Sequence, residues 1–365
     1  MAWALVHLLG YAFYYYPLHY DSHYYLEEAA LFNATGSFHD VYIFYRAYVV
    51  LLALLPHVNV VIAFQTVLSL FACMTLVKAV RHVNENAFTA TAVVLVFFGW
   101  WEVIRWNLAI MSESVFYSLT CFMLFAVAVF KGRKRDYLLL LVIGWLLTMT
   151  RPTGAIVTLA VIMFLVVRSK ENVPSKYQAI ALLAFAAMSV LSVVVLLNLY
   201  DMSNQFHQGN IIQYMDESKQ TPLYYESLRV DVSNLVVRKD LEDTFLKTYT
   251  FIVDNPGIFF KAFLLKIFYL LSTVRPYYGM LHNVFNVLWI VAIYFFSFRG
   301  WQRIDHPVKW FCLALIVFNC LAVGCSSLDW DNRFYIPMAP AFVILAAVGM
   351  SDVLNKLNLR FQHRE

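Results

Sequence analysis

The stretch KGRKRDYLLLLVIGWLLTMTRPTGAIVTLAVIMFLVV, residues 131–167, carries the pattern that decides the fold. A basic turn at 131–135 precedes two apolar runs, 137–149 and 153–167, which only a short polar turn separates. Apolar runs of this kind between charged turns are typical of helices that pack in a lipid bilayer. The stretch therefore predicts two membrane helices joined by a tight connection.

The composition of the whole chain agrees with this prediction. Of the 365 residues, 61% are hydrophobic and only 14% are charged, whereas soluble domains carry roughly 25% charged residues. The net charge of +4 is spread over short loops, so the sequence has no basic surface of the kind that nucleic acids require. We expect an all-α, polytopic, multi-pass integral membrane protein that contacts membrane lipids and binds no nucleic acid.

Twelve apolar segments are candidate helices: 1–16, 42–56, 59–79, 87–101, 114–130, 137–149, 153–167, 179–199, 258–273, 281–298, 310–325 and 335–350. Several are shorter than the ~20 residues that span a bilayer, which predicts short or tilted helices. The first segment has neither a basic flank nor a small-residue cleavage site, so we expect a retained helix rather than a signal peptide.

The charges of the loops predict the orientation. Basic stretches are expected on the cytoplasmic side; they are 131–135, 168–176, 299–309 and 356–364. Three stretches then lie outside: 17–41, 201–257 and 326–334. This orientation requires that 42–56 and 258–273 lie along the membrane surface. We therefore expect about 10–12 transmembrane helices with interfacial helices beside them.

The longest polar stretch divides the chain into three parts. Residues 1–200 form a transmembrane module with a first outer loop at 17–41, residues 201–257 form an extracytoplasmic loop that caps a cavity, and residues 258–365 form the C-terminal transmembrane helices.

The first outer loop gathers acidic, imidazole and phenol side chains, namely Asp21, His23, Tyr24 and Tyr25. If a helix starts at Ser22, then Asp21, Tyr24, Tyr25 and Glu28 share one face. Gly36 is a stop signal for that helix. Asp21 is either an N-cap that accepts backbone N–H groups or a carboxylate with a chemical role.

Two further motifs stand at helix ends that are predicted to lie outside. Ser112 and Glu113 open an apolar helix, either as helix-start chemistry or with Glu113 lining a cavity. Arg151 precedes Pro152, a residue suited to a first helical turn. Arg151 either extends to the interface or binds phosphate through its planar guanidinium. Upstream, the spacing of Glu102 and Arg105 predicts an ion pair on one helix face.

The C-terminal part holds two more candidates. Arg275 and Tyr277, in the stretch Val274–Gly279, are expected to frame a lipid head group. Asp329 and Asp331 are either a solvated loop or weak ligands for a divalent cation, and Arg333 follows at the start of the last helix. The sequence contains no phosphate-binding glycine loop, Cys/His metal cluster or nucleophile elbow.

These motifs in this order resemble the membrane glycosyltransferases of the GT-C superfamily, and are similar to the protein O-mannosyltransferases and the lipid A aminoarabinose transferases. The resemblance rests on four motifs. The first is an acidic residue followed by aromatic residues after the first helix, and the second and third are a Ser-Glu motif and an Arg-Pro dipeptide. The fourth is an Arg-aromatic pair, followed by a proline, at the start of a late helix. In this chain they are Asp21 with Tyr24 and Tyr25, Ser112-Glu113, Arg151-Pro152, and Arg333-Phe334 with Pro337. The first outer loop departs from the pattern, since many relatives carry adjacent acids where this chain has one.

The resemblance implies transfer of a sugar, with inversion, from a polyprenyl- or dolichyl-phosphate donor to a lipid, glycan or protein acceptor on the outer or lumenal face. Asp21 is then the expected general base. Arg151, Arg275 and Arg333 are expected at the phosphate, and His23, Tyr24, Tyr25 and Tyr277 at the substrate. Glu113 is expected to hold sugar hydroxyls or to act as a second acid. The membrane would be the inner membrane in a bacterium and the endoplasmic reticulum in a eukaryote.

Two alternatives remain open. One is a flippase or transporter of lipid-linked sugars, although such proteins often show matching halves with broken helices, which this sequence lacks. The other is a polymerase or ligase that uses lipid-diphosphate-linked glycans.

Overall fold

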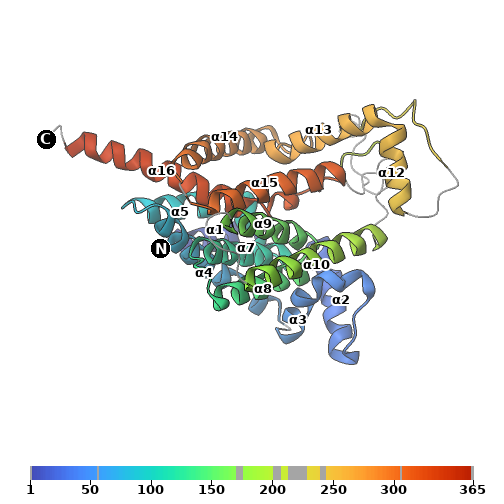
Figure 1. Ribbon diagram of the computed structural model, residues 1–365, viewed down its shortest axis with the longest axis horizontal. Coiled ribbons are helices and arrows are strands. Elements are labelled where there is room, and N and C mark those ends of the chain that lie inside the picture. Colours follow the sequence, from blue (N-terminus) through green and yellow to red (C-terminus); the bar gives the residue numbers. More distant parts are fainter. Residues whose placement is uncertain are drawn as a thin grey trace. The chain divides into compact units, whose positions relative to one another are not determined.

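The computed structural model describes residues 2–55, 57–169, 176–199, 207–212, 228–238, 244–304 and 306–362. Helices dominate this part of the chain (Figure 1). The described residues contain no strand and only two isolated bridges, Asn210 with Arg229 and Ile212 with Leu328. The predicted all-α class is thus confirmed.

The contacts divide the chain into two compact units, which we treat separately. The first unit comprises Met1–Ser189, Ala292–Ile316 and Ile336–Glu365, and the second comprises Val190–Val291 and Val317–Tyr335. The chain thus leaves and re-enters the first unit twice, a grouping that a division into consecutive parts of the sequence does not anticipate.

The helices up to residue 199 are α1 (Ala2–Tyr14), α2 (Tyr20–Thr35), the 3-10 helix η1 (Asp40–Tyr45), α3 (Arg46–Leu54), α4 (Val58–Val83), α5 (Thr89–Gly99), α6 (Trp101–Ile104), the 3-10 helix η2 (Arg105–Leu108), α7 (Ser112–Ala128), α8 (Lys134–Thr150), α9 (Gly154–Ser169) and α10 (Lys176–Leu199). The later ones are α12 (Thr244–Asp254), α13 (Pro256–Ser272), α14 (Met280–Arg303), α15 (Val308–Cys325), the 3-10 helix η5 (Arg333–Tyr335) and α16 (Ala339–Gln362). Each of the twelve apolar segments coincides with a helix. The predicted outer loop 201–257 lies partly outside the described residues.

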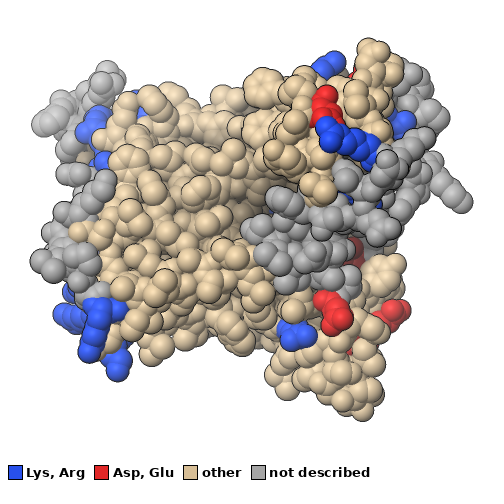
Figure 2. All heavy atoms as spheres, turned by 45° about the vertical axis from the view of Figure 1, so that its right-hand side comes forward, with Lys and Arg blue, Asp and Glu red and all other residues tan. Residues whose placement is uncertain are grey.

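Four helices in the described part of the chain are long and apolar enough to cross a membrane: Val58–Val83, Met280–Arg303, Val308–Cys325 and Ala339–Asn358. A fifth candidate is the pair Thr89–Gly99 and Trp101–Leu108, bent by 68°, and shorter apolar helices accompany these. Large parts of the surface drawn in Figure 2 carry no Lys, Arg, Asp or Glu. Length, composition and surface together support an integral membrane protein.

Helix α7 is the centre of the first unit. It packs against α4, α8, α9 and α16, and nearly every residue from Ser112 to Ala128 is buried. A helix that is enclosed on all sides has no exposed face to place polar groups on. The polar groups at its first turn, Ser112 and Glu113, must therefore find partners inside the protein.

An irregular segment leads into α7 and is held by side chains from other helices. The amide of Gln65 in α4 donates to the carbonyl oxygens of Trp106, Asn107 and Ala109, at 3.4, 3.4 and 2.7 Å. The hydroxyl of Tyr48 donates in turn to the Gln65 amide oxygen at 2.9 Å. Buried carbonyl groups without partners are costly, so Gln65 stabilises backbone that the α6–α7 connection leaves unpaired.

Two glycines allow α14 and α16 to approach at backbone contact within the first unit. A Cβ atom at Gly300 would lie 1.9 Å from the carbonyl oxygen of Leu345, and one at Gly349 would lie 2.0 Å from that of Phe296. No side chain fits either position without separating the helices. Small residues at such crossings are common where helices associate in membranes.

We expect Gly300→Ala to lower the free energy of unfolding by about 1–3 kcal/mol, because the added methyl group forces the two helices apart. Denaturant or thermal unfolding of the purified protein in detergent measures this. Gly279→Ala is the matched control, since no atom lies within 4 Å of the position of its Cβ. Equal effects of both substitutions would contradict the proposed contact.

Candidate functional site

The start of α2 is fixed against the segment that precedes α7. The N–H of Ile110 donates to the carbonyl oxygen of Pro17 at 2.8 Å, and the hydroxyl of Ser22 donates to the carbonyl oxygen of Ile110 at 2.9 Å. The N–H of His19 donates to Ser22 Oγ at 2.8 Å. Ser22, fully buried, thus ties the start of α2 to the segment that leads into α7.

Asp21 occupies the first turn of α2, and the residue in the N-cap position is His19. The interpretation of Asp21 as the N-cap is therefore wrong. The helix ends at Thr35, with Gly36 in the left-handed conformation at φ 71° and its N–H on the carbonyl oxygen of Phe32. The predicted helix and its stop signal are confirmed, and Asp21 is partly exposed at the start of that helix.

The two tyrosines that follow Asp21 differ in exposure. Tyr24 is exposed, as is His23, whereas Tyr25 is buried. The ring of Tyr25 lies 5.3 Å from that of Tyr45 and 5.4 Å from that of Tyr48. Burial, followed by the nearby Tyr45 and the charges of Glu113 and Asp21, holds the pKa of Tyr25 well above its usual range. Tyr25 is therefore a neutral hydrogen-bond donor at all ordinary pH values.

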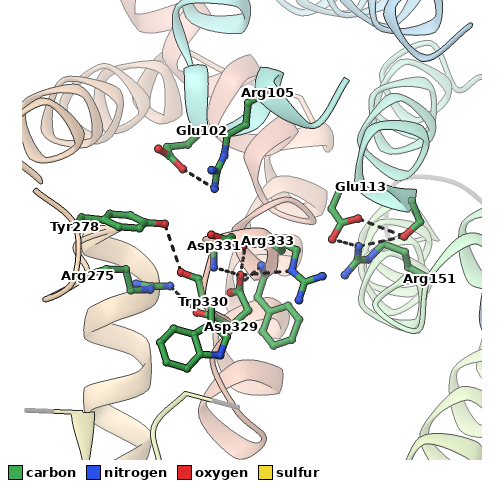
Figure 3. Close-up of polar contacts among 12 residues, drawn as sticks. Glu102, Arg105, Glu113, Arg151, Arg275, Tyr278, Asp329, Trp330, Asp331 and Arg333 are labelled. Atoms are coloured by element: carbon green, nitrogen blue, oxygen red, sulfur yellow. Dashed lines mark hydrogen bonds and ion pairs between the residues drawn. The ribbon is translucent and has the colours of Figure 1, made fainter. Parts of the chain in front are cut away.

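Glu113 and Arg151 form an ion pair inside the first unit (Figure 3). The side chains are 0% and 7% exposed. Arg151 Nη1 donates to Ser112 Oγ at 3.2 Å, and that hydroxyl donates to Glu113 Oε2 at 3.4 Å. The predicted extension of Arg151 to the membrane surface is therefore wrong. Ser112 is also not the cap of α7, since the N-cap residue is Met111.

The local structure explains why this pair forms. Arg151 is the first residue beyond α8 and has extended backbone, so its side chain leaves the helix where α7 begins. Glu113 lies in the first turn of α7, where unpaired N–H groups favour negative charge. Pro152 stands two residues before α9 in a turn, not in the helix itself. The start of α7 thus holds a carboxylate, a hydroxyl and a guanidinium in mutual contact.

Glu28 in α2 and His39, just before η1, form a second carboxylate contact that the sequence did not predict. The Nδ1 atom of His39 lies 2.9 and 3.0 Å from the two Glu28 oxygens, and the His39 backbone N–H donates to Oε1 at 3.1 Å. The Glu28 side chain is 2% exposed and the imidazole 72%. Burial and the charges of Glu28 and Asp21 raise the pKa of nearby Tyr42 to about 12.

Glu102 and Arg105 also pair, as their spacing predicted, with Oε2 and Nη2 3.1 Å apart (Figure 3). The Arg105 guanidinium lies 4.7 Å from the centre of the Trp106 ring. This pair lies in α6–η2, the segment that follows the 68° bend after α5.

In the second unit, Asp329 organises the loop before η5 (Figure 3). Its Oδ2 accepts the N–H groups of Asp331 at 3.0 Å and Arg333 at 2.5 Å, and its Oδ1 accepts that of Phe334 at 3.2 Å. Asp329 is 2% exposed, so the interpretation as a solvated loop is wrong for this residue. Because both oxygens accept backbone N–H groups, the geometry does not fit the divalent-cation site considered for Asp329 and Asp331. The described residues contain no metal-binding group of three His, Cys, Asp or Glu.

Arg275 is fully buried and holds backbone rather than projecting into a cavity. Its Nη1 donates to the carbonyl oxygens of Tyr269 at 2.8 Å and Val274 at 2.9 Å, and its Nη2 donates to that of Asp329 at 3.3 Å. Tyr277 donates to the carbonyl oxygen of Trp330. These hydrogen bonds hold the α13–α14 connection against the Asp329 loop. They occupy donors of Arg275 and Tyr277, the residues that were expected to frame a lipid head group.

Arg333 differs from Arg275 in exposure. Its side chain is 23% exposed and its Nε lies 4.0 Å from Asp329 Oδ2. The ordered loop thus presents this guanidinium at a defined place while leaving part of it in contact with the surroundings.

Two solved structures were found to be similar to this chain. The archaeal oligosaccharyltransferase AglB from Archaeoglobus fulgidus, in complex with an inhibitory peptide and a dolichol-phosphate, matches with a TM-score of 0.52 and 12% identity over 99% of this chain and 51% of AglB. ArnT from Cupriavidus metallidurans, bound to undecaprenyl phosphate, matches with a TM-score of 0.48 and 13% identity over 96% of this chain and 59% of ArnT. The chain therefore spans between half and three-fifths of the length of these proteins.

No protein-family model matches the sequence, and neither does any curated protein. The likeness to AglB is one of fold. It supports the all-α membrane fold that the sequence indicates.

We expect Arg151→Met to lower the free energy of unfolding by about 3–5 kcal/mol, because it leaves the Glu113 carboxylate buried without a counter-charge. Adding Glu113→Leu removes that charge, so the double variant should regain part of the lost stability. Chemical unfolding in detergent measures both, and Arg133→Met in an exposed loop should change stability by less than about 0.5 kcal/mol. Simple additivity of the two substitutions would argue against the pair.

Proposed function

We propose that the protein is a membrane glycosyltransferase that moves a sugar, with inversion, from a polyprenyl-phosphate donor to an acceptor hydroxyl on the outer or lumenal face. The observation that carries this proposal is the fold, which the chain shares with an oligosaccharyltransferase whose structure holds a dolichol-phosphate. The arrangement at the start of α2 supports it, since a partly exposed carboxylate follows a loop that Ser22 fixes in place.

In the proposed reaction Asp21 accepts the proton of the acceptor hydroxyl. The acceptor oxygen forms a bond to the anomeric carbon of the sugar, and the bond from that carbon to the phosphate oxygen breaks. The polyprenyl phosphate leaves with the electron pair. A positioned general base contributes about 10²–10⁴-fold to such a step.

The second proposed role is sugar binding by the Glu113–Arg151 pair. Glu113 lies beside the Arg151 guanidinium, and an ionised carboxylate accepts hydrogen bonds from hydroxyl groups strongly. Tyr25, held neutral by its surroundings, adds a donor in the same unit. We therefore assign sugar binding to Glu113 and the fixing of its orientation to Arg151.

Of these two arginines, Arg333 and not Arg275 is the proposed ligand of the donor phosphate. The Arg275 guanidinium donates to three backbone carbonyl oxygens, and binding phosphate would require it to release them. Arg333 keeps an exposed part, and a guanidinium presents paired N–H donors to phosphate oxygens.

The central test is Asp21→Asn, which keeps the size of the side chain and removes its ability to accept a proton. We expect sugar transfer to fall by at least ~100-fold, with folding and donor binding unchanged. The matched control is Asp40→Asn, which neutralises an exposed acid of the same outer segment and should leave transfer intact. Full activity of the Asp21 variant would remove it as the base.

A second test separates the two arginines. Arg333→Gln should raise the KM for the donor by about tenfold and leave the unfolding midpoint close to that of the wild type. Arg275→Gln should lower the unfolding midpoint, because three carbonyl oxygens lose their donor. Steady-state kinetics with a labelled donor, together with thermal unfolding, measure both. If Arg333→Gln leaves the KM unchanged, its assignment to the phosphate is wrong.

A further inference from the structure

Three cations share one carboxylate where α14 and α16 meet in the first unit. Asp352 Oδ2 lies 3.2 Å from Lys356 Nζ, 3.5 Å from Arg299 Nη2 and 3.6 Å from Arg303 Nη2. We call these four residues the cationic junction. Its cations are 36–53% exposed, and its net formal charge is +2, from three cations and one anion.

The junction is built on a rigid base. The glycine contact between Gly300 and Gly349 holds the two helices together within one turn of Arg299 and Asp352. On the other side, Asn84 Nδ2 and Asn86 Nδ2 donate to Oγ and to the carbonyl oxygen of Ser351, at 3.3 and 3.2 Å. These contacts fix the position of Asp352, so the cations around it are positioned before any ligand arrives.

The Asp352 carboxylate does not provide acceptors for all the N–H donors of these cations. A guanidinium has five N–H donors, and the two arginines reach Asp352 only at 3.5 and 3.6 Å. The Nε of Arg299 is buried and has no hydrogen-bond partner among the described residues. A buried donor without a partner is unfavourable, which points to an anion that the three cations bind together.

The surroundings indicate that this anion belongs to a lipid. Phe295 and Phe298, on the same helix, are 55% and 65% exposed, and both α14 and α16 carry candidate membrane spans. The rings of Trp301 and Trp310 lie 5.8 Å apart at the same end of α14. Exposed apolar rings, then tryptophans and cations, follow the order from hydrocarbon to head group at a membrane surface.

We propose that the cationic junction binds the phosphate of an anionic phospholipid from the bilayer, with the acyl chains along Phe295 and Phe298. The guanidinium groups of Arg299 and Arg303 supply paired N–H donors to the phosphate oxygens. The Lys356 ammonium adds a third donor, and the end of α14 favours positive charge. This site is independent of the sugar-transfer chemistry proposed above.

The test compares two variants with the same change in charge. The full-length protein is incorporated into nanodiscs of phosphatidylcholine with and without phosphatidylglycerol, and retained phosphatidylglycerol is counted by native mass spectrometry after release. We expect R299Q/R303Q to weaken its retention by about tenfold or more. The control R133Q/R135Q, in the basic loop at 131–135, should weaken it by less than about twofold.

A third variant changes retention in the opposite direction. Asp352→Asn removes the anion that competes with the lipid phosphate, so it should tighten retention of phosphatidylglycerol. Equal losses in R299Q/R303Q and R133Q/R135Q would mean general attraction to an acidic surface and would overturn the site. Displacement of the lipid by inorganic phosphate alone would show a site for the free anion instead, and unchanged retention in both Asp352→Asn and R299Q/R303Q would show no site.

Discussion

The buried ion pair between Glu113 and Arg151 is the interaction on which the first unit depends. The carboxylate stands at the first turn of α7, a helix enclosed by its neighbours, and both charges are withdrawn from solvent. Moving charges out of water is costly, and only good mutual contact offsets that cost. The pair therefore fixes the end of α8 relative to the start of α7, and any ligand that reaches Glu113 meets a carboxylate that is already oriented.

The irregular backbone before α7 extends this constraint to the start of α2. Gln65 satisfies the carbonyl groups of the segment from one side, and Ser22 binds Ile110 from the other. Buried non-helical backbone is tolerated where protein groups satisfy its hydrogen bonds. The same hydrogen bonds that stabilise the connection thus hold α2, and with it Asp21, beside the entrance of α7. This is how the fold gives the carboxylate at the start of α2 a defined position.

Helices, helix ends and pairs close in the sequence could be predicted from local patterns. Contacts between residues far apart in the sequence could not. Apolar runs located the helices, Gly36 marked the end of α2, and the spacing of Glu102 and Arg105 predicted their pairing. The partner of Arg151 is 38 positions away, so no local pattern could reveal it. Arg275 resembled a phosphate ligand because its three carbonyl partners appear only after folding. The contact of His39 with Glu28 likewise depends on how η1 folds back on α2.

Sugar transfer by the purified protein tests the central claim most directly. A polyprenyl-phosphate donor labelled in the sugar is supplied in a bilayer together with a panel of lipid, glycan and peptide acceptors. The proposed function predicts labelled acceptor and free polyprenyl phosphate in equal amounts, with inverted configuration at the anomeric carbon. Movement of intact donor across the bilayer, without transfer to any acceptor, would contradict it and favour a transporter.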